Sequence, residues 1–244
     1  MAKKLTRKEK IALQQQSKEA GTERPVVKKN IPRQSKGANK LTIYLGFIVA
    51  ALAFLLYANT LNHDYALDDY SLIKENSMTR KGSAAIGEIL HSTYRAGYFN
   101  TDAQLYRPLS KVFFALEWQY SHGDPEGAPH FGHWVNVLFY ALTGFLLFYA
   151  LSLYLKGNYI ASFLTASLFI AHPIHTEVTA NIKSLDEILC FLMFVITIIF
   201  VHRYIQKNSI FNLGIAMASF FLALLKTNFN FIRSSHYCYN FNVV

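Results

Sequence analysis

The chain has 244 residues, of which 52% are apolar, and its formal net charge at pH 7 is +9. This excess lies in residues 1–40, which hold 12 basic and 3 acidic residues, while residues 41–244 hold 12 of each. The two cysteines, Cys190 and Cys238, exclude a disulfide framework and a cysteine-based zinc site. Residues 1–40 lack apolar periodicity, so we expect a disordered tail and no nucleic-acid partner.

Long uncharged runs indicate a membrane protein. Residues 41–62 contain no charged side chain over 22 positions, which exceeds the roughly 20 residues that a helix needs to cross a bilayer. We predict spans at residues 41–61, 134–155, 159–175, 188–205 and 210–225. The expected fold class is therefore an all-α, polytopic membrane bundle. The third span has only 13 residues before His172, so it must continue into HPIHTEV or be shielded by its neighbours.

The distribution of charge predicts the orientation. A basic run directly before the first span indicates a cytoplasmic N-terminus. Residues 62–133 and the junction at 171–187 then both face away from the cytoplasm. Within the outer loop, apolar residues recur at helical spacing over 86–98 and 109–120, so we expect two amphipathic helices along the membrane surface. Residues 226–244 carry no span signal, and we expect a truncation or a shifted reading frame there.

The first candidate site is DYALDD, at residues 64–69. Asp68 and Asp69 follow the first span by only a few residues, so their height above the membrane is restricted. Adjacent carboxylates can serve as a base and an acceptor, although on an extended or turn backbone they point apart. The alternative for Asp69 is a helix N-cap for the segment YSLIKEN.

The second candidate site is AHPIHTEVTANIKSLDE, at residues 171–187. His172, His175 and Glu177, together with Asp68, could hold a divalent metal ion, with Asp186 as a further carboxylate. Two structural alternatives remain open. The histidines could bond to backbone groups freed by Pro173, and the whole segment could be a solvated turn.

Two cations are candidates for binding a phosphate at this surface, namely Arg107 in the outer loop and Lys183 in the junction. Either could instead be simply solvated. Ser184 and Glu187 have the spacing of a capping box at the start of the fourth span, which would explain Glu187 without any chemistry.

Three stretches taken together resemble a known family. YALDDYSLIKEN after the first span, YRPLS in the outer loop and AHPIHTEVTANIKSLDEIL at the third-to-fourth span junction are similar to the polyprenyl-phosphate-sugar-dependent GT-C glycosyltransferases. The resemblance is in particular to the transmembrane and tetratricopeptide-repeat O-mannosyltransferases and their bacterial relatives. It covers residues 41–225. Such enzymes usually continue past the fifth span with a Ser-Lys-Glu type motif and more spans.

The resemblance implies a GT-C-like N-terminal half with Asp68 as catalytic base and Asp69 as its neighbour. It implies an inverting transfer of a sugar, mannose in that family, from a polyprenyl- or dolichyl-phosphate donor to a protein hydroxyl. The membrane would be the bacterial inner membrane or the endoplasmic reticulum.

Two other interpretations stay open, a non-enzymatic membrane protein such as a transporter or assembly partner, and a nonfunctional remnant of a transferase. Transporters tend to place ionisable groups near the bilayer midplane and to show related halves. Here the polar groups gather at one face and no halves are visible, which favours the transferase.

Overall fold

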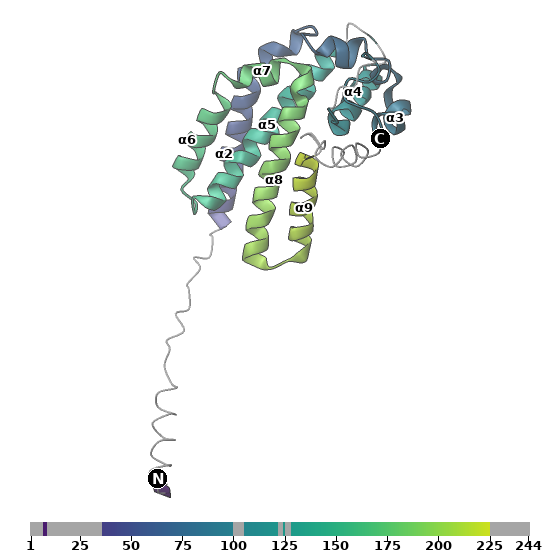
Figure 1. Ribbon diagram of the computed structural model, residues 1–244. Helices are drawn as coiled ribbons and strands as arrows, with labels where there is room; N and C mark the ends of the chain where they lie inside the picture. Colours follow the sequence, from purple (N-terminus) through teal and green to yellow (C-terminus); the bar gives the residue numbers. More distant parts are fainter. Residues whose placement is uncertain (1–6, 9–35, 100–104, 122–123, 125–127, 225–244) are drawn as a thin grey trace, which may run out of the picture. The chain divides into compact units, whose positions relative to one another are not determined.

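The computed structural model describes residues 7–8, 36–99, 105–121, 124 and 128–224 (Figure 1). All regular structure in these residues is helical, which confirms the predicted all-α class. Most of the basic tail predicted for residues 1–40 lies outside the described residues. The tail predicted for residues 226–244 lies entirely outside them.

Among the described residues, three helical stretches are long and apolar enough to cross a membrane, at Lys40–Asn62, Pro129–Tyr154 and Ile182–Lys207. They overlap the helices α2 (Lys36–Tyr57), α5 (Ala128–Tyr154) and α8 (Leu185–Lys207). The other two predicted spans correspond to shorter apolar helices, α6 (Tyr159–Ile170) and α9 (Ile210–Leu224).

The apolar helices pack side by side, with α5 between α2 and α8 and with α6 and α9 on the flanks (Figure 1). Their central core combines aromatic side chains such as Tyr140 and Phe148 with small and branched ones such as Ala53, Val137 and Ala166. Small residues let the helix axes approach closely, which is how helices associate where water provides no driving force.

Helix α6 ends five residues before the limit predicted from the sequence. Its last carbonyl, at Ile170, accepts hydrogen bonds from the hydroxyls of Tyr140 at 3.0 Å and Tyr57 at 3.4 Å. These bonds provide partners for a carbonyl that the end of a helix would otherwise leave unpaired. The chain then turns through Pro173, which cannot continue the helical bonding, and α7 begins at His175 and ends at Ala180.

Short helices lie between the end of α2 at Tyr57 and the start of α5 at Ala128. These are η1 (Ala58–Asn62), η2 (Tyr70–Lys74), η3 (Thr79–Ala85), α3 (Ile86–Ile89) and α4 (Pro108–Tyr120), followed after α7 by η4 (Ile182–Ser184). The helix predicted at 109–120 is confirmed as α4, with Pro108 in its first turn.

The helix predicted over 86–98 is wrong beyond Ile89, because the chain continues in turns. Two buried side chains take the place of main-chain donors there. The Lys111 ammonium donates to the carbonyls of Thr93 at 3.3 Å and Ala96 at 2.7 Å, and the Asn76 amide also donates to Ala96 at 3.0 Å. Gly97 follows at a φ of 95°, a backbone conformation that side chains disfavour.

Helix α4 is buried more deeply than a helix lying on a membrane surface would be. Phe114 and Trp118 belong to a core with Tyr65 and Leu72. The same helix buries Glu117, whose two carboxyl oxygens have no hydrogen-bond partner among the described residues. Burial, and to a lesser extent the nearby charge of Asp69, raises the pKa of Glu117 well above its usual range, which favours the protonated, neutral form of this side chain.

Replacing Tyr140 by Phe removes the shorter of the two hydroxyl bonds to the Ile170 carbonyl. We expect a loss of about 1 kcal/mol of stability, because one buried hydrogen bond disappears while the ring packing is kept. Thermal unfolding in detergent would measure it, with Tyr44→Phe as the matched control because Tyr44 is 65% exposed. Equal melting temperatures for the two variants would contradict this role of Tyr140.

The Glu117→Gln variant tests whether the pKa of buried Glu117 is raised in the folded protein. The pKa of Glu117 is raised in the folded state, so between its ordinary value of 4.5 and the folded value the folded chain holds a proton that the unfolded chain releases. Wild-type stability therefore falls as pH rises through that range, and the Glu117→Gln variant should escape this loss.

The measurement is the melting temperature of both proteins from pH 5 to pH 8, with Glu88→Gln as control because Glu88 lies in an exposed pair with Lys81. A difference between the Glu117→Gln variant and wild type that stays constant with pH would show that Glu117 ionises freely.

Candidate functional site

The segment YALDD closes into a tight turn that separates its two aspartates. The Asp69 N–H donates to the Ala66 carbonyl at 2.9 Å, and the Ala66 N–H donates back to Asp69 Oδ2 at 3.0 Å. Between them Leu67 has a φ of 46°, which costs a non-glycine residue about 1–3 kcal/mol. The turn directs Asp69 into the protein and leaves Asp68 at the surface.

Asp69 connects the two segments that the sequence singled out. Its side chain is fully buried, and Oδ1 accepts the backbone N–H of Lys183 at 2.7 Å, across 114 residues of sequence. It occupies the position before η2 but makes no capping bond, so the N-cap interpretation is wrong. Burial raises the pKa of Asp69, while the hydrogen bonds from Ala66 and Lys183 oppose part of this rise.

Asp68 lies at the surface between two cations. Its side chain is 39% exposed, and both carboxylate oxygens are 3.4 Å from Arg95 Nη2. Lys183 Nζ lies 3.7 Å from Asp68 Oδ2. The structure therefore brings together Asp68, Asp69 and Lys183, and it adds Arg95, which the sequence analysis missed. The signal for Arg95 was weak, because one arginine inside an amphipathic pattern looks like a solvated side chain.

Helix α5 supports the junction from the other side. The buried Asn136 amide donates to the carbonyl of Asn181 at 2.8 Å. A side chain at Gly132 would bring its Cβ within 2.7 Å of Ile182 Cγ2, so the close approach of α5 requires glycine there. Asn136 could have been found from the sequence, because a polar residue inside an apolar run needs a partner.

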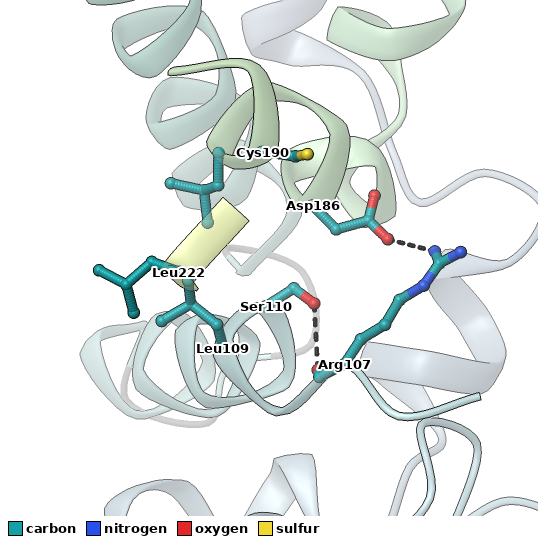
Figure 2. A pocket seen from close by; sticks show the side chains of 7 residues that line it. Arg107, Leu109, Ser110, Asp186, Cys190 and Leu222 are labelled. Carbon is teal, nitrogen blue, oxygen red and sulfur yellow. Dashed lines mark hydrogen bonds and ion pairs between the residues drawn. The ribbon is translucent and has the colours of Figure 1, made fainter. Parts of the chain in front are cut away.

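Arg107 and Asp186 pair with each other, as Figure 2 shows. The Arg107 Nη1 to Asp186 Oδ2 distance is 2.5 Å, and the guanidinium lies over the Tyr94 ring at 5.2 Å. Burial acts to lower the pKa of Arg107, but the charge and hydrogen bond of Asp186 outweigh it and raise the pKa. Ser184 makes no capping bond through its side chain, so the capping box is not formed.

A cleft lies beside this ion pair (Figure 2). One side is polar, formed by Arg107, Asp186 and Ser110, whose hydroxyl donates to the Arg107 carbonyl at 3.2 Å. The remaining lining is contributed by Leu109 of α4, Leu189 and Cys190 of α8, and Leu222 of α9. The cleft thus offers a charged end and a largely apolar wall.

The histidines lie in the bend between α6 and α7. His172 Nδ1 accepts the N–H of Ile174 at 3.3 Å, as the backbone alternative expects. The His175 ring packs on Phe169 with a centroid distance of 4.5 Å, and Glu177 is exposed. Among the described residues, no three His, Cys, Asp or Glu side chains gather closely enough to hold a metal ion. The divalent ion stays a prediction.

Neither a protein-family model nor a solved structure matches the chain. Among curated proteins, it is 26% identical over 181 residues to human protein O-mannosyl-transferase TMTC1, which covers 73% of this chain and 20% of the relative. It is 30% identical over 164 residues to human protein O-mannosyl-transferase TMTC2, covering 62% of this chain and 18% of the relative. For human protein O-mannosyl-transferase TMTC4 the identity is 28% over 165 residues, with 62% and 22% covered.

The chain thus spans about a fifth of the length of the curated relatives it matches. All three relatives are named protein O-mannosyl-transferases. The DD, YRPLS and HPIHTE segments resemble a family of O-mannosyltransferases as well. Over most of its length, this chain is similar to membrane protein O-mannosyl-transferases.

Proposed function

We propose that the chain is the N-terminal part of an inverting glycosyltransferase of the membrane. It transfers a sugar, mannose by analogy with the relatives, from a polyprenyl-phosphate donor to a protein hydroxyl on the extracytoplasmic side. The observation that carries the proposal is the surface carboxylate of Asp68, beside the ammonium of Lys183. A base and a cation at that spacing suit a reaction that takes a proton from one substrate and releases a phosphate from the other.

Asp68, rather than Asp69, serves as the base. The raised pKa of Asp69 would by itself mark it as the better candidate. However, Asp69 is fully buried, and each of its oxygens already accepts a backbone N–H. A general base must come within hydrogen-bond reach of the proton that it removes. Asp68 is open to solvent and meets this requirement.

In the proposed reaction, Asp68 takes the proton of the acceptor hydroxyl as its oxygen attacks the anomeric carbon. The bond from that carbon to the phosphate oxygen breaks, and the polyprenyl phosphate leaves with the electron pair. Attack opposite the leaving group inverts the anomeric centre. Lys183 stabilises the negative charge that develops on the phosphate. Arg107 is a second predicted phosphate ligand, and Asp186 already binds one edge of its guanidinium.

The location of these groups supports a donor anchored in lipid. Lys183 lies at the start of the apolar stretch Ile182–Lys207, and Asp68 follows the end of Lys40–Asn62 by a few residues. A phosphate at the membrane surface would lie at this level. The basic tail before the first span supports the extracytoplasmic placement, in a bacterial inner membrane or the endoplasmic reticulum.

Asp68→Asn tests the base. We expect transfer to fall by about 10²–10⁴, the usual contribution of a general base, while membrane insertion is unchanged. The assay follows mannose transfer from a radiolabelled polyprenyl-phosphate mannose in membranes containing the natural gene product. Glu75→Gln is a matched control, because Glu75 is an exposed carboxylate nearby in sequence. Turnover at the wild-type rate would remove Asp68 as the base.

Asp69→Asn should lower the stability of the protein rather than remove a catalytic base. An amide oxygen can replace one carboxylate oxygen, but its NH₂ group faces an N–H donor, so one buried donor loses its partner. The expected cost is about 1–3 kcal/mol of stability. Thermal unfolding in detergent should therefore show a lower melting temperature for Asp69→Asn and an unchanged one for Asp68→Asn. The reverse order would contradict the separate roles of the two aspartates.

A further inference from the structure

Arg95 has no role in the proposed reaction, yet the structure holds it firmly in place. The turn that carries it lies between the carbonyls of Thr93 and Ala96, which both accept from the Lys111 ammonium. Asn76 also donates to Ala96, and the N–H of Ser77 donates to Gly97 at 3.0 Å. The backbone on both sides of Arg95 is therefore fixed by polar contacts, including those from the buried side chains of Lys111 and Asn76.

Burying the Lys111 ammonium to hold this turn reduces the stability of the folded protein. Lys111 is only 1% exposed, and its ammonium is bound by carbonyls, the Ser92 hydroxyl and the Met78 sulfur. Burial lowers the pKa of Lys111 to about 8. A buried ammonium without a carboxylate against it is unfavourable compared with an apolar side chain of the same size. Precise positioning of a functional side chain is a benefit that can offset this cost.

The ion pairs that Asp68 makes are loose. The contacts from Arg95 are 3.4 Å and the contact from Lys183 is 3.7 Å, against about 2.7–2.9 Å for a strong charge-assisted hydrogen bond. The three side chains are also accessible, with 33% of Arg95, 39% of Asp68 and 26% of Lys183 exposed. Exposed pairs of this kind contribute little stability, so a better anion could displace the carboxylate at small cost.

We propose that Arg95 and Lys183 together form the binding site for the phosphate of the donor, and that Asp68 occupies this site as an internal anion until the donor arrives. The inference rests on the proposed function. A phosphate offers more oxygens and more charge than one carboxylate, and the planar guanidinium of Arg95 matches its geometry. When the phosphate takes both cations, Asp68 is released and can accept the proton of the hydroxyl. The donor thus prepares the base.

If Asp68 occupies the phosphate site, substitutions of the cations and of Asp68 should change the affinity for a phosphate in opposite directions. Arg95→Gln and Lys183→Gln each remove a phosphate ligand and should weaken binding of a short polyprenyl phosphate by about 10- to 100-fold, as loss of one charge-assisted hydrogen bond does. Asp68→Asn removes the competing anion and should bind the same probe more tightly than wild type. A purely structural role for the ion pair would instead weaken binding in all three variants.

The experiment is calorimetric titration of the natural gene product in detergent with geranylgeranyl phosphate. Inorganic phosphate and geranylgeraniol, titrated separately, distinguish a lipid phosphate from a free one and from chain binding alone. Lys81→Gln is the control variant, because Lys81 is an outer-region cation paired with Glu88 and lies outside the site. Arg95→Lys keeps the charge without the planar guanidinium and should give an intermediate affinity, which also covers the case that Arg95→Gln misfolds.

Three results would overturn the inference. They are equal affinities for Arg95→Gln and Lys81→Gln, weaker binding by Asp68→Asn, and wild-type affinity for inorganic phosphate equal to that for the lipid phosphate. If wild type bound geranylgeranyl phosphate no better than geranylgeraniol, the result would contradict the proposed function, because the protein would not recognise a polyprenyl-phosphate donor. The first two results contradict only the phosphate site of Arg95 and Lys183 and are compatible with a polyprenyl-phosphate donor. Failure of the phosphate site and failure of the proposed function can therefore be distinguished.

Discussion

The arrangement of the candidate site depends on one hydrogen bond, from the Lys183 N–H to the buried carboxylate of Asp69. A buried carboxylate without donors is strongly destabilising, so Asp69 can be accommodated only where two backbone N–H groups converge. One comes from its own turn and the other from a segment 114 residues away. Because main-chain groups cannot change rotamer, this bond sets the distance between the turn of Asp68 and the segment of Lys183, and Asn136 secures that segment on its far side.

The neighbouring residues Asp68 and Asp69 therefore have different roles. Asp69 is buried and joins two parts of the chain, while Asp68 points outward beside Arg95 and Lys183. The left-handed conformation of Leu67 and the reciprocal bonds between Ala66 and Asp69 produce this separation. A pair of adjacent acids in a sequence is thus no evidence for a shared proton. The turn that contains them decides which one meets a substrate.

The sequence predicted what depends on local pattern. Apolar runs located the helices, and helical spacing over 109–120 located α4. It failed where side chains replace main-chain bonds. The helical spacing of Tyr94 and Tyr98 continues past Ile89, but the contacts of Lys111 and Asn76 hold turns there. Arg95 and the pairing of Arg107 with Asp186 depend on contacts between distant segments, which no local pattern encodes.

The early end of α6 has a consequence for the lipid around the protein. Twelve helical residues rise about 18 Å, against the roughly 30 Å thickness of a hydrocarbon core. Its neighbours α2 and α5 lie in stretches long enough to match that thickness, so the apolar helix on the α6 side of the bundle is shorter than the helices beside it. Lipid beside α6 must compress, or headgroups must sink along its polar end at His172. Either response makes the bilayer thinner beside α6 than beside α2 or α5, so the protein would locally deform the membrane that holds it.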